Sequence, residues 1–140
     1  MNRQEATSFI ENQKNGVLNT LMEDGRPHAA PIVYAVSGGA IEISSCWTRV
    51  KTKNLRRDPR ASLCILSANG WYPYITVEGK CELIEDPDGR KNLDLYRRIT
   101  DGDPDDVDEY LAAMKTEGRH LISLFMDRIY PTETETSAPC

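Results

Sequence analysis

The residues with the clearest capacity for chemistry lie together in the stretch RVKTKNLRRDPR, residues 49–60. Six basic side chains stand there against the single acid Asp58, a formal charge of +5 in a chain whose net charge is −5. A concentrated positive segment in an acidic protein indicates a local anionic partner. The alternative is a solvated helix face, although such faces usually mix the two signs of charge.

The start of this positive segment suits a phosphate group. Thr48 is the expected N-cap of a short helix that Pro59 ends. Such a helix start offers unpaired N–H groups, the Thr48 hydroxyl offers a donor, and Arg49 and Lys51 add positive charge. The glycine pair at residues 38–39 reads as a hairpin turn, and no Gly-rich phosphate fingerprint is present. The pattern therefore predicts an anion site without identifying the anion.

Length and composition indicate one ordinary folded domain. The chain has 140 residues, of which 39% are hydrophobic and 28% charged. No apolar run approaches the roughly 20 residues of a membrane span, and the first residues do not resemble a signal peptide, so we expect a cytoplasmic protein without a membrane partner. The net charge of −5 disfavours general nucleic-acid binding.

The cysteines and histidines do not predict a metal site or a catalytic triad. The four cysteines have no CxxC pair and no histidine at metal-ligand spacing, so we expect buried thiols. His28 and His120 are too few and too far apart in the sequence to indicate a triad.

Hydrophobic alternation and turn residues predict six strands, at residues 17–22, 27–36, 40–46, 61–68, 71–83 and 120–130. Asp24-Gly25 indicates a hairpin, and Glu78-Gly79 indicates a β-bulge. Helices are expected after Asn2, over the positive segment, for about 14 residues from Asp86, and at 107–117.

This order of elements predicts a mainly β (α+β) fold, because strands and helices do not alternate as they do in a parallel sheet. A small antiparallel barrel with short peripheral helices fits it best. We expect a single domain over residues 1–131. Residues 132–140 offer little apolar surface to bury and are predicted to form a disordered tail.

Several of these motifs resemble one family. TRVKTKNLRRDPRASLCI, then Trp71, then VEGKCEL at 77–83 closely resemble the pyridoxamine 5'-phosphate oxidase-like split-barrel superfamily. Within it, they are most similar to the actinobacterial branch that uses coenzyme F420, a deazaflavin. The resemblance runs from about Phe9 to Pro131 and includes GVLNTLMEDGRPHAAPIVY. It implies a homodimer of antiparallel six-stranded split β-barrels, with a flavin or deazaflavin in each of two grooves at the dimer interface.

The resemblance also implies which residues bind the cofactor. Four positions match the family's phosphate-binding motif: Arg49, Lys51, Thr52 and Asn54. Arg56 or Arg57 would be available to an acidic tail of the cofactor. The contacts implied for the ring come from two strands and one aromatic side chain: Pro31, Ile32, Val33, Ser44, Ser45 and Trp71. For Trp71, packing in the core is equally compatible with the sequence.

The implied activity is F420-dependent hydride transfer between the deazaflavin and a small organic electron acceptor, which requires neither a metal nor a protein nucleophile. F420 carries a phosphodiester and a γ-glutamyl chain, so it matches the positive segment better than FMN with its single phosphate. An FMN-dependent oxidoreductase, a non-catalytic F420 or flavin carrier, and a small nucleic-acid binder are the alternatives. The source of the proton stays open between solvent and a side chain near the ring, for which Tyr34, Tyr72 and Tyr74 are the candidates.

Overall fold

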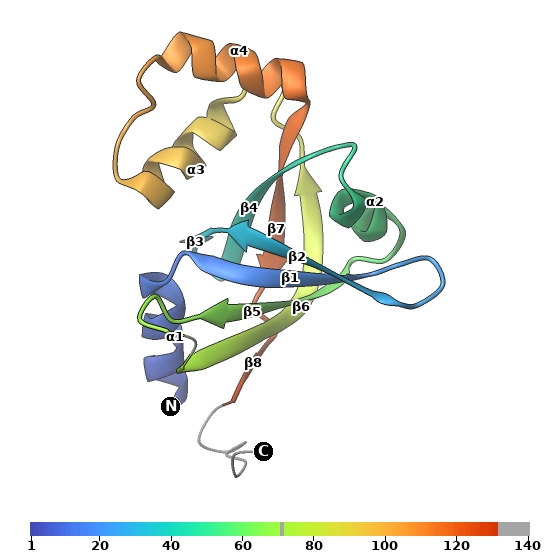
Figure 1. The fold of residues 1–140 in the computed structure, drawn as a ribbon, viewed down its shortest axis with the longest axis vertical. Helices are drawn as coiled ribbons and strands as arrows, with labels where there is room; N and C mark the ends of the chain where they lie inside the picture. The colour runs from blue at the N-terminus through green and yellow to red at the C-terminus, as the bar shows by residue number, and fades with distance from the viewer. Residues whose placement is uncertain (71, 132–140) are drawn as a thin grey trace.

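A computed structural model describes residues 1–70 and 72–131, which form a curled antiparallel sheet flanked by helices (Figure 1). The elements are, in chain order, α1 (Arg3–Asn12), β1 (Asn15–Leu21), β2 (Pro27–Val33), β3 (Ala35–Ser37), β4 (Ala40–Cys46), α2 (Val50–Arg57), β5 (Arg60–Leu66), β6 (Tyr74–Ile84), α3 (Arg90–Thr100), α4 (Val107–Glu117), β7 (Arg119–Phe125) and β8 (Arg128–Tyr130). The strand order is β2-β1-β5-β6-β7-β4-β3, and β8 pairs with β6. The mainly β, antiparallel architecture with peripheral helices is confirmed.

The predicted strand number of six is wrong, because two of the predicted strands are each divided. Residues 27–36 form β2 and β3, which pair with different partners, β1 and β4. The break falls at Tyr34, whose backbone N–H donates to the Lys14 carbonyl (2.9 Å) and whose buried hydroxyl donates to the Ile10 carbonyl (2.6 Å). Residues 120–130 are divided in the same way into β7 and β8.

The helices with strong capping signals lie where the sequence predicts them. The carboxylate of Asp106 accepts from the Glu109 N–H (3.0 Å) at the start of α4, and Gly118 ends this helix with a φ of 65°. The Asn2 side chain caps α1 by accepting from the Glu5 N–H (2.8 Å). Helix α3 begins four residues later than Asp86.

The predicted bulge at Glu78-Gly79 is wrong, because β6 pairs with β5 from Tyr74 to Lys80 without an inserted residue. Gly79 has a different role there. A Cβ at this position would lie 1.8 Å from the Phe125 carbonyl oxygen, so only glycine permits the close approach of the chain after β7.

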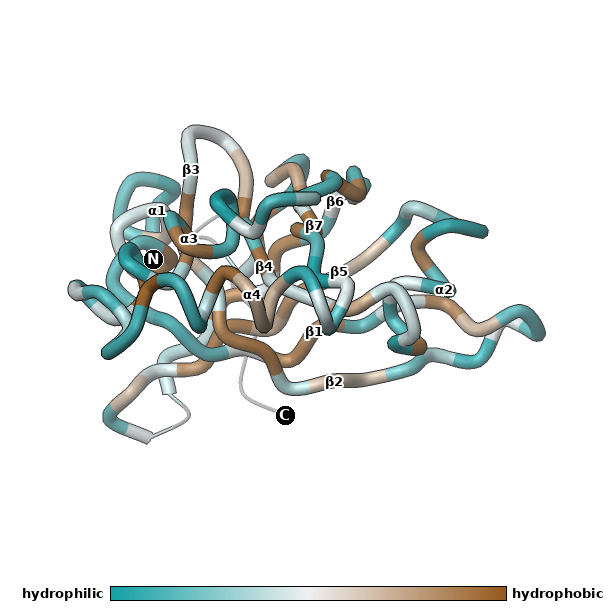
Figure 2. The backbone as a smooth tube through the Cα atoms, turned by 90° about the horizontal axis from the view of Figure 1, so that it is seen from above, coloured by the Kyte–Doolittle hydropathy of each residue, from teal (hydrophilic) through white to brown (hydrophobic). Residues whose placement is uncertain are grey.

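The hydrophobic core lies inside the curled sheet. Figure 2 shows the hydrophobic stretches gathered along the strands in the middle of the molecule. The largest fully buried side chains include Leu18, Ile41, Ile43, Leu63, Ile65, Ile75, Ile122 and Leu124. Among the described residues, no helix is long and apolar enough to cross a membrane.

The described portion of the chain contains three free cysteines, Cys46, Cys64 and Cys81. No group of three or more His, Cys, Asp or Glu side chains is placed there to hold a metal. The expectation of buried thiols is confirmed for Cys46, whereas Cys64 and Cys81 are half-buried. Cys140 and the predicted tail lie outside the described residues.

A buried polar cluster joins α2 to the sheet. His120 on β7 lies opposite Ser45 on β4 in the strand register, and both are buried. The hydroxyl of Thr52 on α2 lies 3.1 Å from the Ser45 hydroxyl and 3.1 Å from Nε2 of His120. We call Ser45, Thr52 and His120 the buried triad. It fixes the first half of α2 against β4 and β7.

Aromatic and cationic side chains cover this triad. The Trp47 ring stacks on His120 with 3.9 Å between ring centroids, and the Arg56 guanidinium lies 4.5 Å from the Trp47 ring centroid. Burial, together with the smaller effects of the positive charges of Arg56, Lys51 and Arg119, lowers the pKa of His120 to about 4. The imidazole is therefore neutral at physiological pH.

This burial makes stability depend on pH in a defined direction. The unfolded chain protonates His120 near pH 6.5 and the folded chain only near pH 4, so the stabilisation is complete above pH 6.5 and is lost as pH falls between these values. We expect the free energy of unfolding, measured with urea, to fall by about 2 to 3 kcal/mol from this group between pH 7 and 4.5. The variant His120→Gln should lack this component.

His28→Gln is the matched control, because it removes the other histidine from β2 and should leave the pH-dependent loss in place. An identical pH dependence in the wild type and His120→Gln would contradict the assignment.

Candidate functional site

An open groove of about 540 Å³ lies between β1 and β2 on one side and the junction of β4, α2 and β7 on the other. Its apolar side includes Val17, Pro31, Ile32 and Val33, with Ile99 of α3 at the rim. Its polar side consists of Ser44, Lys51 and Arg119. The groove therefore joins a hydrophobic surface to a positively charged wall.

The apolar side is formed by the edge of the sheet. Strand β2 has a neighbour on one side only, and its side chains alternate between exposed and half-buried. Pro31 and Val33 lie on its more exposed face, and Val33 is 50% exposed. Prolines are tolerated on edge strands because one side of the ladder needs no N–H donor. This surface is suited to contact with a flat aromatic ring.

The positive wall is built by strand register. Arg119 is the first residue of β7 and lies opposite Cys46, the last residue of β4, which places it beside the loop that leads into α2. Lys51 lies in the first turn of α2. Partial burial lowers the pKa of Lys51, and the nearby charges of Arg49 and Arg119 lower it further. A bound anion would relieve this repulsion.

The start of α2 differs from the expectation by one residue. Thr48 is not the N-cap: Arg49 occupies that position and makes no side-chain capping bond. Thr48 and Arg49 lie in a turn in which the Arg49 N–H donates to the Cys46 carbonyl (3.1 Å). The first-turn N–H groups of α2 have no intrahelical acceptor, which adds to the positive character next to Lys51.

The buried triad lies directly behind the polar wall. Ser44, Lys51 and Arg119 each immediately precede a triad member in the sequence: Ser45, Thr52 and His120. Neighbouring residues point to opposite faces in β4 and β7 and to different sides of the helix in α2, so the triad holds these elements while Ser44, Lys51 and Arg119 meet the groove. Ser45 and Thr52 are buried and do not line the groove, so their contact with a cofactor stays a prediction.

The second half of the positive segment is tied to β1. Asn54 is buried and donates to the Thr20 hydroxyl (3.0 Å), while Arg57 donates to the Leu21 carbonyl (2.6 Å) and to Oδ1 of Asn54 (3.1 Å). Neither Asn54 nor Arg57 lines the groove. These bonds give both side chains a role in anchoring α2.

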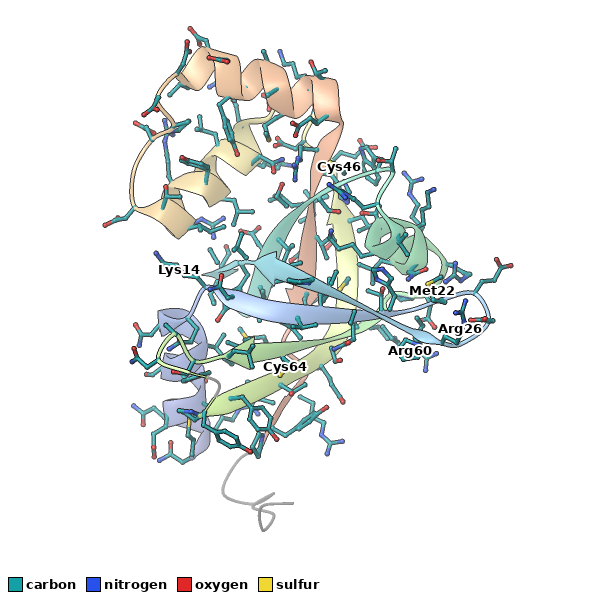
Figure 3. The ribbon with its side chains drawn as sticks, in the orientation of Figure 1. Lys14, Met22, Arg26, Cys46, Arg60 and Cys64 are labelled. Carbon is teal, nitrogen blue, oxygen red and sulfur yellow. The ribbon has the colours of Figure 1, made fainter. Side chains whose placement is uncertain are left out.

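Arg60 also has a partner close by. It forms an ion pair with Asp58 (2.8 Å), and the hydrogen bonds from Arg60 lower the pKa of Asp58 to about 2. Figure 3 shows Arg60 near Arg26 at the hairpin end of the molecule, away from Cys46. The positive segment is thus not gathered at the groove: Lys51 lines it, Arg49 lies close to Lys51, and Arg57 and Arg60 bind partners elsewhere.

The structure brings five predicted residues together at the groove: Pro31, Ile32, Val33, Ser44 and Lys51. Trp71 lies outside the described residues. Sequence reasoning missed Arg119 and Ile99. Arg119 follows the helix-ending Gly118, but no local motif marks it, because the register of β7 with β4 brings it to the groove.

The three tyrosines considered as proton donors differ in their burial. Tyr34 is buried, its hydroxyl donates to the Ile10 carbonyl, and burial raises its pKa. It is therefore poorly placed to protonate a ligand. Tyr74 lies opposite the groove-lining Leu66 in the β5–β6 ladder, and Tyr72 is 73% exposed beside it.

Comparison with solved structures gives the same fold. An F420 reductase is 24% identical, with a TM-score of 0.72 over 88% of this chain and 94% of its own. A conserved hypothetical protein from Mycobacterium tuberculosis is 27% identical, with a TM-score of 0.75 over 92% and 82%. A FAD-binding protein from Mesorhizobium loti is 18% identical, with a TM-score of 0.69 over 92% of both chains.

The family comparison covers almost the whole chain. The model for pyridoxamine 5'-phosphate oxidase matches residues 3–130, which include every strand of the sheet and every groove residue. Combined with the curled antiparallel sheet, this match shows that the chain belongs to the pyridoxamine 5'-phosphate oxidase family, within a superfamily of oxidoreductases that bind flavin-type cofactors.

Proposed function

We propose that this protein is an F420-dependent oxidoreductase that reduces a small organic acceptor. The observation that carries the proposal is the groove itself, where an apolar strand edge faces a positive wall formed by Lys51 and Arg119. A ligand with a flat ring and an anionic tail would satisfy both sides. The lowered pKa of Lys51 supports an anion at this wall, because partial burial and the nearby charges of Arg49 and Arg119 disfavour its charged form, which a bound anion would favour.

The groove residues fit a flavin-type cofactor. Arg49, Lys51, Arg119 and the start of α2 would hold the phosphate, and Pro31 and Val33 would contact the ring. When bound, the deazaflavin would supply the hydride. The protein's part is to orient the ring along β2, to neutralise the phosphate, and to exclude water from the apolar side of the groove.

The preference for F420 over FMN rests on only part of the charge of the positive segment, because several of its cations do not lie at the groove. Arg57 and Arg60 have partners within the protein, and Arg56 lies over Trp47. Lys53 is exposed and does not line the groove. The cations at or beside the groove are therefore Arg49, Lys51 and, from β7, Arg119, and Glu117 accepts a hydrogen bond from Arg119 (2.8 Å). Three cations suit a phosphodiester with further carboxylates, and the structural similarity to an F420 reductase supports the same choice. An FMN-dependent oxidoreductase remains the second candidate, since the same cations could hold one phosphate.

A homodimer is also part of the proposal. The outer face of β2, β1 and β5 presents small or uncharged side chains in register, including Ala29, Asn19 and Ser62. Ala29 and Pro31 are exposed on an edge strand, a surface that a second copy would cover. The groove opens next to this face, so a partner subunit would help to enclose the cofactor.

Cofactor preference can be measured by fluorescence titration of the purified protein with F420, FMN and FAD. We expect F420 to bind tightest, in the micromolar range or better, because its several negative charges meet three cations. Reduced F420 should then be oxidised in the presence of quinone or nitroaromatic acceptors. Tighter binding of FMN would overturn the choice of cofactor, and binding of F420 without turnover of any acceptor would indicate a carrier.

Lys51→Met should weaken F420 binding by about tenfold to a hundredfold, since a charge-assisted hydrogen bond contributes roughly 1.5–3 kcal/mol. Wild-type affinity should also fall as pH rises through the lowered pKa of Lys51, below 10.5, because the neutral amine no longer attracts an anion. The urea midpoint should stay the same or rise, since the charged form of Lys51 is disfavoured in the fold.

Lys53→Met is the matched control. It removes the same charge from an exposed position of α2 that does not line the groove. Equal losses of affinity in the two variants would show that only overall charge matters and would contradict the phosphate assignment.

Ala29→Arg should convert the proposed dimer into a monomer, because it puts a large charged side chain on the face that a second copy would cover. Analytical ultracentrifugation of the full chain measures this directly. Ala112→Arg, at an exposed position of α4, is the control and should remain dimeric. A monomeric wild type at micromolar concentration would contradict the dimer.

A further inference from the structure

We propose that Ser44 determines ligand specificity in the groove by presenting a hydrogen-bond acceptor, and no donor, to the bound ring. The inference rests on the proposed flavin-type function and adds a chemical requirement for the part of the ligand that meets Ser44. Its basis is a chain of three side chains, Asp86, Asn92 and Ser44, in which each hydrogen bond fixes the direction of the next.

The chain begins at Asp86, which is buried in the turn before α3. Its carboxylate accepts three N–H donors: the Lys91 backbone (3.0 Å), the Asn92 backbone (2.8 Å) and Nδ2 of Asn92 (2.7 Å). A carboxylate offers only acceptor sites. The group that faces it from Asn92 must therefore be the amide nitrogen.

This contact fixes the orientation of the Asn92 side chain, which is 1% exposed. With Nδ2 directed at Asp86, the remaining atom, Oδ1, is the one that meets Ser44. An amide oxygen can only accept. The Tyr110 hydroxyl also donates to the Asn92 carbonyl (3.2 Å), which holds this residue from the side of α4.

Ser44 must consequently donate its single hydroxyl hydrogen to Oδ1 of Asn92. Its oxygen retains lone pairs and has no hydrogen left to offer. Ser44 lines the groove from β4, next to the positive wall. The hydroxyl therefore meets a ligand as an acceptor.

The position of this hydroxyl is rigid because α3 is fixed to β4 at two points. Asn92 binds Ser44, and Arg98, further along α3, forms an ion pair with Glu42 on β4. Ser44 itself lies in the β4–β7 ladder opposite Leu121. Rotation of the serine to offer its hydrogen would leave the buried oxygen of Asn92 without a donor, which is costly.

The requirement has a direct meaning for flavin-type rings. The pyrimidine edge of flavins and deazaflavins carries one donor, N3–H, between two carbonyl acceptors. A ring whose N3–H faces Ser44 would satisfy both groups. A ring carbonyl at the same place would instead face the serine oxygen with no hydrogen between the two acceptors. A site built around a hydrogen bond rejects an analogue that lacks it far more strongly than an apolar site does.

The test compares FMN with N3-methyl-FMN, and 5-deaza-FMN with N3-methyl-5-deaza-FMN, since all four probes keep the phosphate. In titrations with wild-type protein, N3-methylation should weaken binding about tenfold or more. In Ser44→Ala the parent compounds should bind several-fold more weakly. The ratio of the Kd of the methyl compound to the Kd of its parent should shrink to about threefold or less.

Asn92→Leu keeps Ser44 in place but removes the oxygen that takes its hydrogen, so the serine can donate or accept. The ratio of the two Kd values should shrink in this variant as well. Because Ser44 still occupies the same space, such a change would reflect the hydrogen bond and not the room available to the methyl group. Ser37→Ala is the control: it removes a hydroxyl from an exposed position of the neighbouring strand β3 that does not line the groove, and it should leave the ratio at its wild-type value.

Failure of the Ser44 inference can be distinguished from failure of the proposed function. Tight binding of both members of each pair with equal affinity, or an unchanged ratio in Ser44→Ala, would overturn the inference and leave the proposed function intact. Absence of binding for all four probes, and for F420, would overturn the proposed function and this inference with it. Should Asn92→Leu fail to fold, the comparison of wild type, Ser44→Ala and Ser37→Ala still decides.

Discussion

The hydrogen bonds among Ser45, Thr52 and His120 are the constraint on which the groove depends. They connect β4, α2 and β7 at one buried point, and no other contact seen in the described residues joins all three elements through side chains. Because an unpaired buried polar group is costly, the three elements can separate only at a considerable loss of free energy. The buried triad does not itself line the groove, but it fixes the positions of Ser44, Lys51 and Arg119, which do.

The positive wall shows how an acidic protein can gather positive charge at one place. The net charge of the chain is −5, yet Lys51 and Arg119 lie together at the groove, with Arg49 close enough to affect Lys51. The repulsion among these positive charges is unfavourable in the folded chain, and a bound anion would offset it. Local arrangement, and not overall charge, sets the affinity of such a site.

Local signals were sufficient for much of the fold. Helix α4 and strand β4 have the predicted bounds, because Asp106, Gly118 and the alternation of residues 40–46 act within a few positions of the chain. The division at Tyr34 was not predictable, since it depends on contacts with Lys14 and Ile10. The same distinction applies to the site. Lys51 could be predicted from a motif, but Arg119 reaches the groove only through the register of two strands that are distant in sequence.

The positive segment itself illustrates the limit of counting charges. A count of charge gives its six cations equal weight, yet Arg57 binds a backbone carbonyl, Arg60 binds Asp58, and Arg56 covers Trp47. Motif resemblance assigned Thr52 and Asn54 to the phosphate, whereas the structure buries both side chains in hydrogen bonds that hold α2. Burial and partners depend on tertiary packing, which composition does not reveal.

The one-residue offset between groove and triad also limits how this chain can vary in length. Ser44, Lys51 and Arg119 each immediately precede a triad member, so a single inserted or deleted residue within β4 or β7 would exchange the two faces of that strand. In β7 this exchange would place the charge of Arg119 in the core and a triad member in the groove. The turn between β1 and β2 and the loop at 101–106 carry no such pairing. Insertions and deletions should accumulate in those connections, while the spacing inside the strands that frame the groove stays constant.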